Sequence, residues 1–379
     1  MIYHLEEIDR IRNVEIETAN RIGKSIFDLS NWNSGKNYQN YLLQYLEFPS
    51  INNCFDYIYG YELTNDIHHL TQEKLNFKNS DISSIFFPSS TLSIINMANF
   101  LQKNKIKNIC VLQPSYFSVV PCLRTFGLNV YDEELEYING KFSIPIEIIM
   151  NKNIDAVWLT SPIFCTNITF SNLEIKKLNY LLGNKIYLVC DESLSTKETQ
   201  LSIKLLNNEY LFSIFSPHKV LGTNAIKFSC IITNQKYAEF FNMWSDLFAG
   251  GMTLSSRIAI KHFLTDNYEI VLQKGMEYIQ QTYFELEKLL NKHKRYCSFT
   301  CMPGLYVTIM VKNISYELST KHQFIKSIIE NTGVSLLPGY LEGFYEKFGF
   351  CFRINLTLDR TLLLTSLNKV LTYLEREYL

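Results

Sequence analysis

A lysine in the second half of the chain has the surroundings of a reactive amine. The segment SIFSPHKVLGTNAIKFSCIIT (213–233) contains two apolar runs that are typical of strands, and Lys219 lies between them. Most lysines are solvated surface groups, but a buried amine has a lowered pKa and is a nucleophile in its neutral form. Taken alone, this segment fits a solvated lysine as well as it fits a functional one.

Other polar side chains come directly after apolar runs. Asp191 and Glu192 stand at the end of KIYLVCDES (185–193), and Tyr116 follows shortly after NICVL (108–112). In open α/β sheets, ligands bind outside the carboxyl ends of the strands. Carboxylates and an aromatic ring at these positions therefore indicate a binding site.

Three hydroxyl residues, Ser89, Ser90 and Thr91, stand where an apolar run gives way to a helical pattern. Ser and Thr cap helix N-termini, and the free N–H groups of such a terminus bind anions. An N-cap without a ligand is the commoner case, so this segment alone does not distinguish an anion site from a simple cap.

The elements that must position these residues alternate along the centre of the chain. Helix-compatible segments, such as 91–103 and 171–182, separate most of the strand-like runs, which are 108–112, 155–161, 185–193, 210–216 and 226–233. Strands that alternate with helices predict an α/β domain with a largely parallel sheet. The nearly continuous apolar character of these strands predicts helices on both faces of the sheet.

The pattern changes from about residue 255, where a long helical stretch with an apolar stripe begins (255–294). Strand-like runs and helical segments follow it at 305–311, 318–331, 348–358 and 359–377. This order predicts a second, smaller α+β domain, with the domain boundary on the long helix near 255–275.

Composition excludes several classes of protein. Hydrophobic residues make up 47% of the 379 residues, which is enough for a large core and too much for a mainly disordered chain. A formal net charge of -1 gives no global field to hold a polyanion, so we expect no nucleic-acid partner. No run approaches the ~20 apolar residues of a membrane span, and the charged N-terminus is no apolar signal segment. The nine cysteines are scattered, which predicts reduced core residues in a cytoplasmic protein and no metal site.

Motifs of other enzyme classes do not occur in the sequence. It has no G-x-G-x-x-G after a strand, no G-x-S-x-G and no H-E-x-x-H. A hydride-transfer Rossmann enzyme and a Ser-His-Asp hydrolase are therefore disfavoured, and the histidines offer no metal-binding spacing.

Four segments together resemble the class I/II aminotransferases, which are fold type I pyridoxal-phosphate enzymes. In chain order, PSY resembles the family's aromatic stacking motif, VCDES its cofactor-aspartate strand, SPHKVLG its Ser-x-x-Lys-x-x-Gly signature, and FRINLTL its C-terminal arginine motif. The resemblance covers about residues 45–358.

The resemblance implies the aspartate aminotransferase-like fold of PLP-dependent transferases, which is α/β with a mostly parallel sheet of seven strands in a large domain. The large, cofactor-binding domain would comprise residues 45–260. A smaller α+β domain would combine residues 1–44 with residues 261–379. By the same resemblance, the protein would be a homodimer with its active site between the domains and at the dimer interface.

The resemblance also assigns roles by position. Lys219 would form a Schiff base with the cofactor aldehyde and then move the proton at the substrate Cα, Asp191 would pair with the protonated pyridine nitrogen, and Tyr116 would stack on the ring. The remaining cofactor-binding candidates, chiefly for the phosphate, are Ser89, Ser90, Thr91, Thr166, Ser216, Lys227 and, from the partner subunit, Tyr57. For Tyr57, in the run YIYGY, an ordinary packed turn is an equal alternative.

Arg353 would bind the substrate α-carboxylate, because a planar guanidinium matches a carboxylate with two parallel hydrogen bonds. The alternative is a surface arginine on a strand. The apolar neighbours of Arg353 alternate less cleanly than those of a solvated strand, which favours the functional interpretation.

The chain departs from the family's pattern at four positions. Leu194 and Phe164 replace a tyrosine and an asparagine that donate hydrogen bonds to the cofactor's ring oxygen in the family, although Asn167 or Ser193 could replace these donors. Lys227 replaces the phosphate arginine, and Ser229 replaces a glycine. The lysine, the aspartate and the C-terminal arginine remain.

We therefore expect a PLP-dependent aminotransferase that moves an amino group from an amino acid to a 2-oxo acid. One alternative is a divergent fold type I enzyme of specialised metabolism, such as a decarboxylase, lyase, cyclase or oxidase. Another is a non-catalytic descendant with a binding role, against which the retained Lys219 argues.

Overall fold

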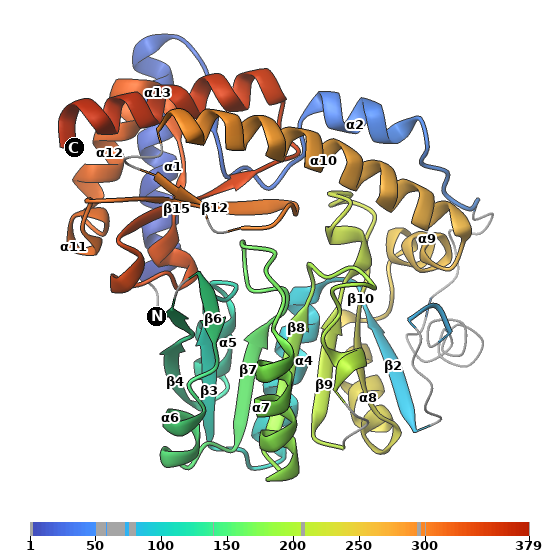
Figure 1. Cartoon of the computed structure of the whole chain (residues 1–379). Coiled ribbons are helices and arrows are strands. Elements are labelled where there is room, and N and C mark those ends of the chain that lie inside the picture. Colours follow the sequence, from blue (N-terminus) through green and yellow to red (C-terminus); the bar gives the residue numbers. More distant parts are fainter. Residues whose placement is uncertain are drawn as a thin grey trace. The chain divides into compact units, whose positions relative to one another are not determined.

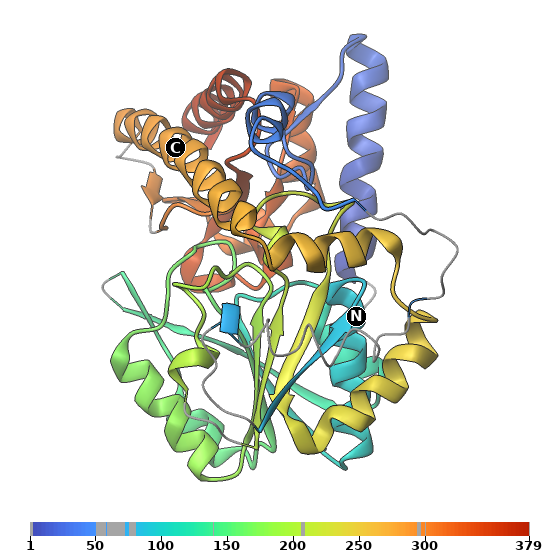
Figure 2. The ribbon, with the colours of Figure 1, turned by 90° about the vertical axis from the view of Figure 1, so that its right-hand side faces the viewer.

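The computed structural model describes residues 3–50, 58, 73–75, 81–138, 140–205, 209–293, 297–299 and 301–378. The chain divides into two compact units (Figure 1, Figure 2). Unit 1 comprises Met1–Gln44, Cys165–Asn167 and Gln273–Leu379, and unit 2 comprises Tyr45–Phe164 and Ile168–Leu272. Each unit has its own sheet and its own hydrophobic core.

Unit 2 is built on a seven-stranded sheet with the order β2-β10-β9-β8-β7-β3-β4. Strand β10 is antiparallel to both of its neighbours, and the other pairs are parallel. The predicted mostly parallel α/β sheet is thereby confirmed. The strands are β2 (Ile82–Phe87), β3 (Asn108–Gln113), β4 (Asn129–Glu134), β7 (Ala156–Thr160), β8 (Tyr187–Glu192), β9 (Leu211–Phe215) and β10 (Ser229–Asn234).

Helices cover both faces of this sheet, as the apolar strands predict. Figure 2 shows α4 and α8 on one face and α7 on the other. Apolar side chains of α4 and α8 pack with alternate residues of the strands, such as Val111, Trp158 and Val189, in one buried cluster. The helices of unit 2 are α4 (Ser90–Lys103), α5 (Val119–Thr125), α6 (Ile146–Asn151), α7 (Asn172–Gly183), α8 (Ala238–Ala249) and α9 (Leu254–Phe263), and a hairpin joins β5 (Glu136–Ile138) to β6 (Lys141–Ser143).

Unit 1 contains a four-stranded antiparallel sheet with the order β11-β12-β15-β14. Its strands are β11 (Cys297–Phe299), β12 (Tyr306–Val311), β15 (Phe350–Asn355) and β14 (Leu337–Pro338), and a separate parallel pair joins β1 (Phe27–Asp28) to β13 (Val334–Ser335). The helices are α1 (Tyr3–Ile22), α2 (Lys36–Leu43), α11 (Tyr316–Ser319), α12 (His322–Thr332) and α13 (Arg360–Tyr378), together with the unit 1 part of α10 (Asp266–Lys292).

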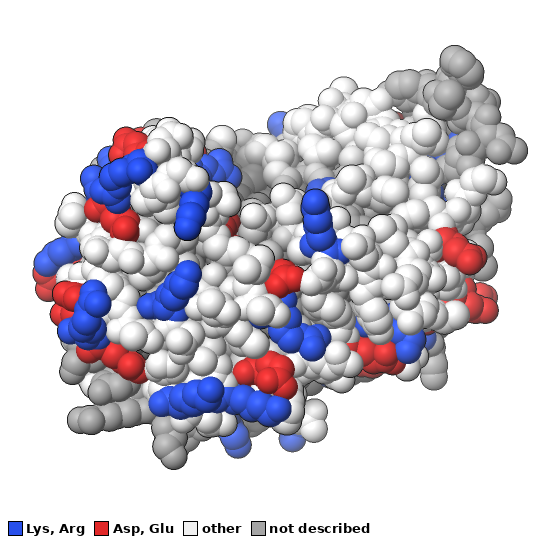
Figure 3. Space-filling view, turned by 90° about the horizontal axis from the view of Figure 1, so that it is seen from above, with Lys and Arg blue, Asp and Glu red and all other residues white. Residues whose placement is uncertain are grey.

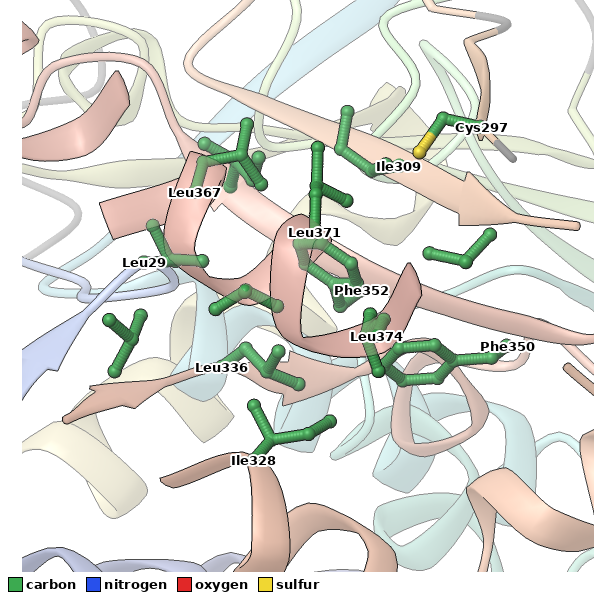
Figure 4. Close-up of a cluster of buried hydrophobic side chains, with 14 of the residues drawn as sticks. Leu29, Cys297, Ile309, Ile328, Leu336, Phe350, Phe352, Leu367, Leu371 and Leu374 are labelled. Carbon is green, nitrogen blue, oxygen red and sulfur yellow. The ribbon is translucent and has the colours of Figure 1, made fainter. Parts of the chain in front are cut away.

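The core of unit 1 is formed where α13 packs on the sheet (Figure 4). Leu367, Leu371 and Leu374 recur at the spacing of one helical face, and all three are buried. Phe350 and Phe352 project from one face of β15 into the same cluster, because side chains two residues apart share a face of a strand.

The long helical stretch predicted at 255–294 is divided in the structure into α9 and α10. The break occurs at Thr265, whose backbone N–H donates to the His262 carbonyl at 3.0 Å. The Thr265 hydroxyl donates to the same carbonyl at 2.7 Å. These bonds satisfy a free carbonyl at the end of α9, and periodicity alone does not reveal such a local cap.

Charged residues of both signs lie interspersed on the face drawn in Figure 3. That distribution accords with the nearly equal numbers of basic and acidic residues, 36 Lys plus Arg against 37 Asp plus Glu. Among the described residues, no helix has both the length and the apolar character to cross a membrane.

We predict that Leu371→Ala lowers the free energy of unfolding of unit 1 by about 2–5 kcal/mol, because the side chain is removed from a closed core. The matched control on the same helix is Leu362→Ala, where the side chain is 54% exposed, and its effect should stay within about 0.5 kcal/mol. Denaturant unfolding followed by circular dichroism measures both changes. Equal effects of the two substitutions would contradict the packing described here.

Candidate functional site

The carboxyl edge of the unit 2 sheet gathers most of the predicted site residues. Parallel strands end at one edge, and β2, β3, β7, β8 and β9 all end there. The antiparallel strand β10 begins at that edge, so Lys227 lies there too, two residues before Ser229. Segments that are far apart in the sequence are therefore brought together by strand direction alone.

Lys219 ends a short 3-10 turn, η3 (Pro217–Lys219), which begins one residue after the end of β9. Its Nζ lies 5.5 Å from the centre of the Tyr116 ring. The residue is half-buried as a whole, and burial of its amine lowers the pKa of Lys219 below the usual value. The charge of Asp191 opposes this shift, whereas the charge of Lys227 adds to it. The amine is thus shifted toward its neutral, nucleophilic form.

Asp191 and the next residue, Glu192, have different surroundings. Asp191 is buried, and its Oδ1 accepts a hydrogen bond from the Ser193 N–H at 3.1 Å. Successive side chains of a strand point to opposite faces, so Glu192 faces away from Asp191. The carboxylate of Glu192 accepts hydrogen bonds from Leu201 N, Ser202 N, Ser202 Oγ and Ser213 Oγ.

Burial raises the pKa of Glu192, and these four hydrogen bonds oppose that rise. With its carboxylate oxygens engaged by the chain, Glu192 anchors the end of β8. Asp191 is the carboxylate of the pair that influences Lys219.

The N-terminus of α4 has the form of an anion site. Ser89 is the N-cap, and its hydroxyl accepts the Leu92 N–H at 3.4 Å. The hydroxyl of Ser90 is buried and has no hydrogen-bond partner among the described residues. Thr91 is exposed at the first turn. The free N–H groups of this turn and the helix dipole favour a negatively charged group.

Other buried hydroxyls near this edge have no partner among the described residues either. They belong to Thr160 at the end of β7, to Ser161 next to it, and to Ser193 after Asp191. A buried hydroxyl without a partner is costly, and such groups are normally satisfied by protein, water or a ligand. Together with Ser90, they fit a ligand that offers several acceptor oxygens.

Two of the four departures from the family's pattern, Phe164 and Ser229, have local structural explanations. Phe164 is buried, with its ring centre 6.3 Å from that of Tyr116, so it packs near the stacking residue. The Ser229 hydroxyl donates to the Phe215 carbonyl at 3.2 Å and accepts from Ser93 Oγ at 2.9 Å, so it ties α4 to β9. Of the two substitute donors considered above, the Asn167 amide donates to the Pro303 carbonyl, whereas Ser193 Oγ is unpartnered among the described residues.

Three further predicted residues remain, of which Ser216 and Thr166 lie in different units. The Ser216 hydroxyl donates to the Phe228 carbonyl at 2.6 Å and so fixes the loop before β10. Thr166 belongs to unit 1, where its carbonyl accepts the Met302 N–H at 2.8 Å. Tyr57 lies outside the described residues, so its predicted role stays a prediction.

Arg353 lies on β15 of unit 1 and is 1% exposed, so it is not the surface arginine considered above. Its Nη1 donates to Glu342 Oε1 at 2.6 Å, and its Nη2 donates to the Ser30 carbonyl at 2.9 Å. The guanidinium carbon lies 3.9 Å from the centre of the Trp32 ring, within range of a cation–π contact. The charge of Arg353 is neutralised by the buried carboxylate of Glu342. The sequence alone did not indicate this pairing.

A buried histidine pair next to Lys219 also escaped the sequence analysis. His218 Nε2 and His262 Nδ1 are 3.1 Å apart, and His262 Nε2 lies 2.9 Å from Asn267 Oδ1. The side-chain amide of Asn267 donates to the Tyr45 carbonyl, which leaves Oδ1 as the acceptor. His262 therefore donates to Asn267, and His218 donates to His262.

Burial is the larger cause and the neighbouring His262 the smaller cause that together lower the pKa of His218 to about 3. We therefore predict that the ring signals of His218 in NMR spectra do not titrate between about pH 5 and 8, whereas those of a short histidine peptide in the same buffer do. Because the folded protein keeps His218 neutral, this residue makes its full contribution to the free energy of unfolding above about pH 6.5. That contribution is lost as the pH falls from about 6.5 toward 3, by up to about 1.4 kcal/mol per pH unit. A His218 titration midpoint near 6.5 would contradict the buried arrangement.

Comparison with known proteins identifies the family. Residues 31–369 match the family described as aminotransferase class I and II. A search of curated protein sequences found no match. Similar solved structures include the histidinol-phosphate aminotransferase from Clostridium acetobutylicum, with 16% identity, a TM-score of 0.71, and 92% of this chain and 100% of that chain covered.

Another similar structure is the aspartate aminotransferase from Thermotoga maritima, with 16% identity, a TM-score of 0.71, and 97% of each chain covered. A double mutant of the aspartate aminotransferase from Thermus thermophilus has 14% identity and a TM-score of 0.74, with 95% of each chain covered. At such identities the structural likeness shows the fold, whereas the match of 31–369 shows the family. This chain belongs to the class I and II aminotransferases, which are pyridoxal-phosphate-dependent enzymes.

Proposed function

We propose that this protein transfers the amino group of an amino acid to a 2-oxo acid, with Lys219 as the lysine that engages pyridoxal phosphate. One observation carries the proposal. The amine of Lys219 is buried at the carboxyl edge of the sheet, 5.5 Å from the Tyr116 ring and under the influence of the Asp191 charge. An amine so placed is shifted toward the nucleophilic form that an aldehyde requires.

The residues at this edge match the parts of the cofactor in chemistry. Ser89, Ser90 and Thr91 at the N-terminus of α4 would hold the phosphate, with Ser216 and Lys227 beside them. Asp191 would pair with the ring nitrogen, and Tyr116 would lie against the ring. The unpartnered hydroxyls of Ser161 and Ser193 would supply donors to the ring substituents in place of those lost at Phe164 and Leu194.

When bound, pyridoxal phosphate supplies an electron sink for the bonding electrons released at the substrate Cα. The chain's own contribution is to move a proton. In its neutral form, Lys219 Nζ can accept the proton from the substrate Cα and return it, because its pKa is lowered toward the working pH. The Asp191 carboxylate opposes this lowering and keeps Nζ basic enough to bind the proton.

The proposal extends to the roles of the two units, to a homodimer and to the location of the protein in the cell. Unit 2 would be the cofactor-binding domain and unit 1 the small domain, in a homodimer in which Tyr57 reaches the partner's phosphate site. Eight cysteines are free among the described residues, which supports a cytoplasmic protein. The replacements at Phe164 and Leu194 favour one second candidate, a divergent PLP reaction on the same scaffold.

We predict that Lys219→Ala abolishes covalent retention of the cofactor. After incubation with pyridoxal phosphate and reduction with borohydride, the wild-type peptide that contains Lys219 should gain the mass of the reduced cofactor adduct. The variant should show no adduct and no visible absorbance band. Lys236→Ala is the matched control, because Lys236 is an exposed lysine of the same unit, paired with Glu209 at 2.6 Å. An adduct on another lysine of the wild-type protein would reject the assignment.

We predict that Lys227→Ala weakens cofactor binding by about 10- to 100-fold, the loss expected when a charged hydrogen bond worth about 1.5–3 kcal/mol is removed. Lys227→Arg should restore the affinity, because a guanidinium binds phosphate in a bidentate way. Equilibrium titration of the protein with pyridoxal phosphate measures the dissociation constants. If Lys227→Ala binds as tightly as the wild type, Lys227 does not contact the phosphate.

A further inference from the structure

Within unit 1, the arginine of the C-terminal motif is already occupied by a carboxylate of the same chain. Arg353 Nη1 and Glu342 Oε1 are 2.6 Å apart, and the two side chains are 1% and 0% exposed. The Ser30 carbonyl oxygen accepts a hydrogen bond from Nη2 of the guanidinium at 2.9 Å. A substrate carboxylate that binds Arg353 with two hydrogen bonds must therefore displace or share the position of Glu342.

The backbone holds Glu342 firmly in this position. Glu342 ends the 3-10 turn η5 (Gly339–Glu342), and Gly343 follows with a φ of 85°, in the left-handed region that favours glycine. A Cβ on Gly339 would overlap the Cys351 Sγ, so glycine lets this turn pack closely on β15. Glu342 is therefore presented to Arg353 by a tightly packed turn.

The groups that face this pair come from β15 itself and from three other segments. Cys165 interacts with both charged groups, Cys351 and Tyr306 interact electrostatically with Glu342, and Asp28 acts on Arg353. Burial raises the pKa of both thiols and of the phenol, so these three groups are neutral near neutral pH. The charges that remain are those of Arg353, Glu342 and Asp28.

The charge balance decides what happens when a carboxylate arrives. Arg353 and Glu342 neutralise each other, and Asp28 already adds a negative charge nearby. A further carboxylate would increase that negative charge in a buried site, which is costly. Uptake of one proton by Glu342 offsets the charge that the ligand brings and frees the guanidinium for the incoming carboxylate. Burial also raises the pKa of Glu342, although Arg353 and Cys165 oppose the rise.

We propose that Glu342 is a specificity-determining residue, which competes with the substrate carboxylate for Arg353, so that a carboxylate binds there together with one proton on Glu342. This inference rests on the proposed function in one respect, namely that Arg353 receives the carboxylate of the substrate. Carboxylate binding then weakens as the pH rises, because the proton is harder to obtain. A ligand with a neutral group at this position binds independently of pH.

Calorimetry with propionate, an unreactive monocarboxylate, tests the inference without any turnover. Titration of the cofactor-loaded protein near pH 7 in two buffers with different ionisation enthalpies gives the number of protons taken up per propionate. We expect close to one proton, and an affinity that falls by up to about tenfold per pH unit as the pH is raised. Asp28→Asn is the matched control, because Asp28 is the other carboxylate that acts on Arg353, and it should keep the proton uptake.

Glu342→Gln should bind propionate more tightly than the wild type and with no proton uptake. Binding to the wild type without proton uptake would overturn the inference, as would the absence of binding to both the wild type and Glu342→Gln. The wild-type proton count alone decides the question if the variant does not fold. Lys219→Ala should give the same count as the wild type, so failure of the cofactor assignment and failure of this inference are distinguishable.

Discussion

The cost of removing charged groups from water governs both sites of this protein. Lys219 keeps its amine away from solvent at the edge of one sheet, where the charge of Asp191 sustains its basicity and that of Lys227 lowers it. Arg353 is buried in the other unit and is tolerated because Glu342 neutralises it. A buried charge without such a partner would shift its pKa until it became neutral. The arrangement of strands, turns and hydrogen bonds around each charge sets how reactive that charge remains.

The sheet of unit 2 explains how a fold persists at 14–16% identity to solved aminotransferases. Its strands need only be apolar and parallel to deliver their following loops to one edge. The chemistry then depends on a few residues in those loops, and the rest of the sequence is free to change. One replacement even adds contacts, because the Ser229 hydroxyl ties α4 to β9.

Much of the fold could be predicted from the sequence, because apolar runs alternate with helical segments and polar residues mark the strand ends. Lys219, Asp191 and Tyr116 can be identified in this way, since each lies at the end of an apolar run or within a few residues after it. The pairing of Glu342 with Arg353 could not be predicted, because the turn between two glycines gives no sign of which side chain it presents. The His218–His262 pair is equally hidden, since 44 residues separate its members and only the fold brings them into contact.

The proposed function depends on Lys219 as the cofactor lysine and on the edge of the unit 2 sheet as the cofactor site. A crystal structure of the protein grown with pyridoxal phosphate tests this claim most directly. We expect electron density that is continuous from Lys219 Nζ to the cofactor, with the phosphate at the N-terminus of α4. Cofactor density at any other lysine, or a phosphate away from Ser89 and Ser90, would contradict it.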